Sequence, residues 1–156
     1  MDEVIPVLHN VFSAEVVKQF AKLCYGLGFK TIVISKPSGA AAQAGLPEAQ
    51  KLALKKGRAL IVLSGLEDLI ELFKPSQIVF ITPKKYAKEP LDVERITSET
   101  RRGPVAVIFG GSEPGISIKE MELGIPMHIN VEDDLGPLGF ASITLFMISN
   151  TFKTKS

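Results

Sequence analysis

Short apolar runs alternate with amphipathic segments along this chain of 156 residues. The runs are rich in valine and isoleucine, and six of them lie at residues 4–8, 31–34, 59–63, 77–81, 105–109 and 127–131. Near-continuous apolar runs of about four to eight residues are typical of strands that are covered on both faces. We therefore expect these six runs to form a buried sheet.

The segments between the runs show the spacing and the boundary signals of helices. Helical spacing occurs in residues 14–25, 48–56, 66–73, 92–98 and 140–152. Ser13 precedes the first of these segments as an N-cap, Pro47 opens the second, and Gly57 ends it. Because strands and helices alternate, the pattern predicts an α/β fold, with a mainly parallel six-stranded sheet flanked by helices.

The composition narrows the class of protein. With 46% hydrophobic residues and no repeat or linker, the chain is expected to form a single domain over residues 1–156. Cys24 is the only cysteine, which excludes an internal disulfide and fits a reducing compartment. The start is acidic, and no apolar stretch reaches the roughly 18 residues of a membrane span. We therefore expect a soluble, cytoplasmic protein with no membrane partner.

The net charge does not indicate a polyanionic partner. The 18 basic and 17 acidic side chains leave a formal charge of +1, so nucleic acid would have to be bound by a local basic patch. The candidate groups are Lys55-Lys56-Arg58, Lys84-Lys85-Lys88, Arg101-Arg102 and Lys153-Lys155. Each group alone is typical of a solvated surface, whereas two groups around one cleft would favour nucleic acid.

Three glycine-containing turns occur in the C-terminal third, at residues 110–115, 124–127 and 133–139. Glycine lets the backbone approach a ligand closely, so the turns predict a site that is built from loops. Ligands of open parallel sheets bind beyond the carboxyl ends of the strands, where we expect all three turns. The first turn matches neither the dinucleotide-binding nor the phosphate-loop motif, and its glycines are also compatible with turn geometry alone.

Other patterns argue against metal and hydrolase chemistry. His9 and His128 are the only histidines and lie in unrelated runs, so no metal site is expected. Glu132, Asp133 and Asp134 are adjacent and cannot all point one way, as is typical of a solvated loop. No Gly-x-Ser-x-Gly motif surrounds the serines that follow the strands, which leaves a hydrolase triad unsupported.

Three segments occur in a characteristic order along the chain. Residues 22–29 end the first helix, Phe109 to Ile116 contain the first glycine turn, and Ile125-Pro126-Met127 leads through a loop to the closing apolar helix. In this order the segments resemble the three motifs of the SPOUT class of SpoU-like RNA methyltransferases, in its minimal single-domain type. The resemblance covers nearly the whole chain.

The resemblance implies a trefoil knot in the C-terminal third and a homodimer packed through the first and last helices. It implies an S-adenosyl-L-methionine-dependent methyltransferase acting on tRNA or rRNA, with the ribose 2′-hydroxyl as one candidate acceptor. The cofactor would be held by the loops. The expected cofactor-binding residues are Ile81, Thr82, Phe109, Gly110, Gly111, Ile125, Met127, Leu135 and Leu138.

Departures from the family pattern fall on the side chains that would act in catalysis. Lys22 stands where the family has an arginine, and Ser112 where it has a glutamate, with Glu113 one place later. At the positions of the family's serine–asparagine pair, this chain has Asp134 to Gly136. The catalytic candidates are therefore Lys22, Glu113 and Asp134, the last as a general base.

Two further expectations concern the substrate and the alternatives. Lys84, Lys85, Arg101 and Arg102 are the candidate RNA-binding residues, and His9 or Asn10 at the end of the first strand could orient the substrate. The substituted catalytic positions favour, as an alternative, a catalytically silent relative that binds cofactor or RNA. A second alternative is an unknotted doubly wound domain that binds another small nucleotide.

Overall fold

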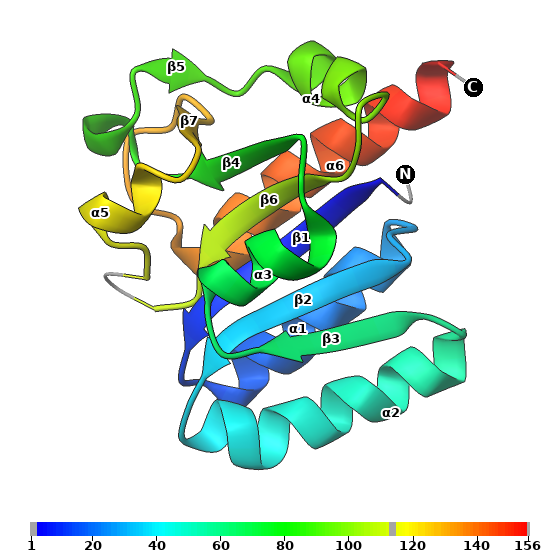
Figure 1. Cartoon of the computed structure of the whole chain (residues 1–156). Helices are drawn as coiled ribbons and strands as arrows, with labels where there is room; N and C mark the ends of the chain where they lie inside the picture. The colour runs from blue at the N-terminus through cyan, green and yellow to red at the C-terminus, as the bar shows by residue number, and fades with distance from the viewer. Residues whose placement is uncertain (1–2, 113–114, 156) are drawn as a thin grey trace.

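The computed structural model describes residues 3–112 and 115–155 and contains one parallel sheet between layers of helices (Figure 1). Its seven strands follow the order β3-β2-β1-β6-β4-β7-β5, and every pair is parallel. The strands are β1 (Val4–Val11), β2 (Thr31–Pro37), β3 (Ala59–Leu63), β4 (Gln77–Ile81), β5 (Glu89–Pro90), β6 (Val105–Gly110) and β7 (Ile125–His128). The helices are α1 (Ala14–Gly26), α2 (Leu46–Lys56), α3 (Leu66–Phe73), α4 (Val93–Glu99), α5 (Ile118–Met121) and α6 (Gly136–Lys155), with a π-helical turn η1 (Ala41–Gly45) and a 3₁₀ turn η2 (Lys84–Tyr86).

The predicted fold class is confirmed, and the six predicted strands are all present. The seventh strand, β5, was not predicted because it has only two residues, both exposed at the edge of the sheet beside β7. The last predicted strand is displaced toward the N-terminus, since β7 ends at His128 and Asn130 adopts a positive φ of 58°. Ile129 and Val131 are apolar because they pack against the core from a connecting segment.

Helix boundaries follow the local signals in the sequence. The Ser13 side chain accepts a hydrogen bond from the Val16 N–H at 3.2 Å and caps α1, as predicted. Gly57 ends α2 with a φ of 65°, a left-handed conformation that glycine adopts without strain. The local chemistry of caps and turns therefore fixes where these helices begin and end.

The two faces of the sheet bury two separate cores. On one face, α1, α2, α4 and α6 cover the larger core, to which β1 contributes Val4 and Leu8. On the other face, α3 and the segment around Ile116 cover a smaller core, to which β1 contributes Ile5 and Val7. Because side chains alternate along a strand, His9 lies on the same face as the smaller core.

Helix α6 has one buried and one exposed apolar face. Leu145 and Ile148 are fully buried against the larger core. Ile143, Phe146 and Met147 are exposed by 39%, 57% and 43% on its other side. Across residues 3–112 and 115–155, no helix is both long enough and apolar enough to span a bilayer.

Candidate functional site

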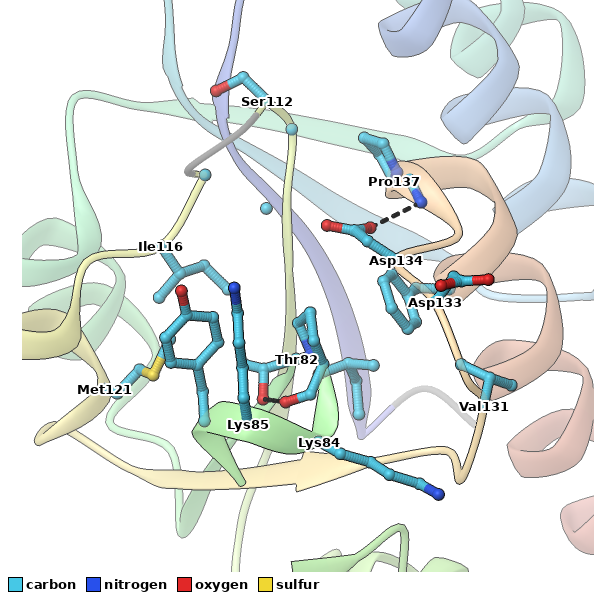
Figure 2. Close-up of a pocket in the computed structure, with 18 of the residues that line it drawn as sticks. Thr82, Lys84, Lys85, Ser112, Ile116, Met121, Val131, Asp133, Asp134 and Pro137 are labelled. Atoms are coloured by element: carbon cyan, nitrogen blue, oxygen red, sulfur yellow. Dashed lines mark hydrogen bonds between the residues drawn. The ribbon is translucent and has the colours of Figure 1, made fainter. Parts of the chain in front are cut away.

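A cleft of about 800 Å³ lies beyond the carboxyl ends of β4, β6 and β7 (Figure 2). Its lining comes from the ends of these strands and the segments that follow them: residues 81–86 from β4, residues 110–112 and 115–118 from β6, and residues 131–134, 136 and 137 after β7. This is the position at which open parallel sheets bind their ligands. The volume is in the range of small-molecule and nucleotide sites, about 300–1,000 Å³.

The first and third glycine turns border the cleft, but the second does not. Gly110, Gly115 and Gly136 line it, whereas Gly124 precedes β7 and lies at the amino end of that strand. The expectation that all three turns share one edge of the sheet is therefore wrong for Gly124. A turn that enters a parallel strand lies at the opposite edge from one that leaves it.

Close backbone packing explains why glycines occupy the first two turns. A Cβ on Gly115 would overlap the Cα of Gly110, and one on Gly111 would lie 2.6 Å from the Cβ of Val11. A Cβ on Gly124 would overlap the carbonyl oxygen of Ile78, at the start of β4. The glycines of these turns are therefore explained by close contacts between backbone segments of the fold, and they carry little information about the ligand.

Basic and acidic side chains line the cleft from different connecting segments. Figure 2 shows Lys84 and Lys85 on η2, and Asp133 and Asp134 on the segment that leads into α6. The Lys85 ammonium lies 4.9 Å from the ring centroid of Tyr86, which is also part of the lining and 43% exposed. The cleft therefore offers cations, an accessible aromatic ring and carboxylates together.

The structure brings some of the predicted cofactor-binding residues to the cleft. Ile81, Thr82, Gly110 and Gly111 line it. The other predicted positions, which are not part of its lining, are Phe109, Ile125, Met127, Leu135 and Leu138. Phe109 and Met127 are buried in the larger core, so strand packing accounts for their apolar character.

Some of the predicted catalytic and RNA-binding residues line the cleft, and others do not. Asp134 lines the cleft, and its Oδ1 accepts the Gly136 N–H at 2.8 Å. Lys22 is exposed on α1 and does not line the cleft, and Glu113 lies outside the described residues. Lys84 and Lys85 line the cleft.

The two other RNA-binding candidates lie at the opposite edge of the sheet. Arg101 and Arg102 are exposed in the turn before β6, which is the amino end of a strand parallel to β4. Lys84 and Lys85 follow the carboxyl end of β4. The two basic groups therefore do not surround one cleft, and only the lysine pair is placed to contact a ligand in it.

A buried polar network beside the cleft was missed by the sequence analysis. His9, at the end of β1, is only 1% exposed, and its Nε2–H donates to Glu120 Oε2 at 2.8 Å. Because a carboxylate can only accept, Nε2 carries the hydrogen, and Nδ1 accepts from the Ser35 hydroxyl at 2.9 Å. The pairing of β1 with β2 places Ser35 beside His9, whereas Glu120 comes from a distant part of the chain.

Burial and charge shift the pKa values of this network. Desolvation lowers the pKa of His9, and Lys36 acts in the same direction, although Glu120 opposes both. Partial burial acts to raise the pKa of Glu120, but hydrogen bonds from Ser117 and the interaction with His9 hold it below its usual value. His9 is therefore a neutral ring at neutral pH.

Acidification is expected to destabilise the fold through His9. The unfolded chain protonates this imidazole near pH 6.5, whereas the folded protein does so at lower pH. The unfolded state then binds more protons at His9. The contribution of His9 to the free energy of unfolding is therefore fully present above pH 6.5 and is lost as the pH falls toward the lower pKa of the folded protein. Urea unfolding at about pH 7.5 and about pH 5.5 measures this loss, and His9→Leu should reduce the difference. An equal difference in both proteins would contradict this origin.

Comparison with known proteins decides the family. A family profile described as RecB-family nuclease (DUF2122) matches residues 39–147. A protein of Aeropyrum pernix proposed to be a type II restriction enzyme, ApeKORF2002P, is 40% identical over 151 residues, covering 94% of this chain and 92% of that protein. The chain belongs to the DUF2122 family. A second relative, MjaORF1200P of Methanocaldococcus jannaschii, also proposed to be a type II restriction enzyme, is 33% identical over 142 residues, covering 91% of this chain and 93% of that protein.

Solved structures with the same fold come from a different class of enzyme. The SpoU methyltransferase AviRb from Streptomyces viridochromogenes superposes with a TM-score of 0.72 at 11% identity, covering 99% of this chain and 61% of that chain. A structure concerned with the 2-OH methylation of C/U34 on tRNA gives a TM-score of 0.75 at 12% identity, with 97% of each chain covered. These similarities show the knot-containing SPOUT fold and nothing about the reaction.

The family match corrects the expectations that came from the motif resemblance. The prediction of a SPOUT-class RNA methyltransferase was wrong, because the matching family is described as a nuclease family and the relatives at 33–40% identity are named as type II restriction enzymes. For the same reason, the expected S-adenosyl-L-methionine cofactor is not supported, and the alternative of a catalytically silent relative that binds cofactor or RNA was also wrong. The reason is physical: the glycine turns that carried the resemblance are required by backbone packing, so they identify the fold and not the activity.

Proposed function

We propose that this protein is a nuclease that acts on DNA and takes one nucleotide of a strand into the cleft beyond β4, β6 and β7. The DUF2122 description and the names of the two restriction-enzyme relatives support the reaction class and the DNA substrate. The observation that carries the proposal is that one cleft is lined by basic, aromatic and acidic residues together, namely Lys84, Lys85, Tyr86, Asp133 and Asp134.

Each part of the lining suits one part of a nucleotide. The Lys84 and Lys85 ammonium groups can bind backbone phosphate, because both lysines are exposed on η2. Tyr86 offers an aromatic face on which a base can stack, and Ile116 and Met121 add apolar surface to the same cleft. Asp134 is the candidate general base, since it is the catalytic candidate among the described residues that lines the cleft.

The carboxylates of the cleft do not fit a resident metal ion. Nucleases commonly use one or two divalent cations that carboxylates hold. Within residues 3–112 and 115–155, no three His, Cys, Asp or Glu side chains come together as a metal site. Glu132, Asp133 and Asp134 are consecutive, and Asp134 already accepts the Gly136 N–H. No step of the proposed reaction is therefore assigned to a metal.

Incubation with end-labelled DNA tests the proposed function. Purified protein is mixed with single-stranded and duplex DNA, in Mg²⁺ and in EDTA, and the products are separated on a denaturing gel. We expect shortened products with the wild-type protein and fewer with Asp134→Asn. Intact DNA under all conditions, together with no binding of either substrate, would refute the proposal.

A homodimer packed through α1 and α6 remains a proposal. The exposed apolar side chains of Ile143, Phe146 and Met147 support it, because a face of this kind is commonly covered by a partner. Light scattering after size exclusion should give twice the 16.9 kDa mass of one chain. A mass of one chain would exclude the dimer under those conditions.

A further inference from the structure

One wall of the cleft consists of a segment with little local stability of its own. Ser117 and Ile118 line the cleft, and so does Met121 at the end of α5. Helix α5 has only four residues, and helices of one turn do not persist in water without outside contacts. The position of this wall must therefore be set by its links to the rest of the protein.

The apolar link is made by Ile116 and Met121. Ile116 is 9% exposed and belongs to the smaller core, and Met121 packs against the same core. Apolar contacts of this kind are not directional, so they hold the segment against the sheet without fixing its orientation. A directional link is needed to fix where the side chains of the wall point.

The polar link runs from β1 to α5 through His9 and Glu120. Glu120 Oε2 accepts from His9 at 2.8 Å, and its Oε1 accepts from the Ser117 N–H at 2.9 Å. The Ser117 hydroxyl in turn accepts the Glu120 N–H at 3.0 Å, which completes a capping box. One carboxylate thus joins the first turn of α5 to the centre of the sheet.

His9 is held rigidly enough to act as the fixed end of this link. It pairs with Ser35 of β2 on one side and with Gly110 of β6 on the other, and its ring is buried. The Gly111 N–H donates to the His9 carbonyl at 2.7 Å, so the backbone beside the ring also contacts the first glycine turn. We propose that His9 is a positioning residue that orients the cleft wall of residues 115–118 and Met121 through Glu120.

The link is also sensitive to pH. The charged groups that act on His9 are Glu120 of α5 and Lys36 of β2, while Ser35 of β2 and Gly110 of β6 present no charge. The neutral ring accepts from Ser35 and donates to Glu120; a protonated ring must donate at both nitrogens, which reverses the hydrogen bond with Ser35. Protonation keeps the donation to Glu120 but removes the hydrogen bond that the ring accepts from Ser35, which is the side-chain contact that fixes the ring against β2. The position of the wall described here is therefore the one that the neutral ring supports.

Hydrogen exchange tests the positioning role without a ligand. His9→Leu replaces the imidazole ring by an apolar side chain of similar size. In this variant, peptides covering residues 115–124 should exchange about tenfold faster than in the wild type, since a hydrogen bond that orders them is lost. Glu120→Ala should give the same or a larger effect. Glu122→Ala, an exposed carboxylate one residue beyond α5, is the matched control and should leave the exchange unchanged. Unchanged exchange in both His9→Leu and Glu120→Ala would overturn the inference.

Oligonucleotide binding tests the consequence for the cleft, which rests on the proposed function. A fluorescein-labelled single-stranded DNA of about 12 nucleotides is titrated from about pH 7.5 to about pH 5.5. The wild-type affinity should fall more steeply than that of His9→Leu, whose affinity should be lower at the upper end. Parallel pH profiles would overturn the positioning role. No binding by the wild type at any pH would instead refute the proposed function, and the exchange experiment would still decide the role of His9.

Discussion

Gly124→Ala should lower the free energy of unfolding by about 1–3 kcal/mol, because its new methyl group enters space that backbone already fills. The added Cβ would overlap the Ile78 carbonyl oxygen and lie 2.8 Å from the Ile78 Cβ. Both groups belong to β4, which is hydrogen-bonded between β6 and β7 and cannot move aside without disturbing two ladders. For a chain of this length the melting temperature should fall by about 2–4 °C for each kcal/mol.

Gly26→Ala is the matched control for this substitution. Gly26 is the last residue of α1, its φ is not in the left-handed region, and a Cβ there would meet nothing within 4 Å. We expect unchanged or slightly increased stability, since alanine is less flexible than glycine in the unfolded chain. Thermal and urea unfolding of both variants measures the contrast. Equal stability of Gly124→Ala and the wild type would show that the turn has room that the structure does not indicate.

The Lys84→Ala/Lys85→Ala double variant should bind single-stranded DNA on the order of tenfold or more weakly than the wild type. Each lysine is proposed to contact a phosphate, and charge-assisted contacts of this kind contribute on the order of 1 kcal/mol each. The salt dependence should also change. If both lysines contact phosphate, the slope of log K against log salt concentration should decrease by about 1.4.

Arg101→Ala/Arg102→Ala removes the same amount of charge at the opposite edge of the sheet and serves as the control. These arginines precede β6, so the loss of affinity and of salt dependence should be small by comparison. Fluorescence anisotropy at several salt concentrations measures both quantities. If the arginine pair has the larger effect, the DNA-binding surface lies away from the cleft, and the proposed placement of the nucleotide is wrong.

Much of the sheet could be predicted from local patterns. Five of the six apolar runs are strands, the sixth overlaps β7 only at Met127 and His128, and Ser13 and Gly57 mark helix boundaries as expected. These features depend on residues that are close in the sequence, namely side-chain alternation and the capping of nearby backbone groups. Strand β5 could not be found in this way, because two exposed residues have no periodicity and pair only where β7 is present.

The sequence by itself determined the strand and helix segments, because these depend on short-range sterics and hydrogen bonding, and it showed where the glycine turns lie along the chain. It did not determine what the turns are for: Gly111 and Gly115 are required by contacts with Val11 and Gly110, and those contacts belong to the fold. Only the tertiary structure joined His9 to Glu120 across 111 positions of the chain and separated Lys84 and Lys85 from Arg101 and Arg102. Such pairings depend on strand order and on which edge of the sheet each loop occupies, and no local pattern of residues carries that information.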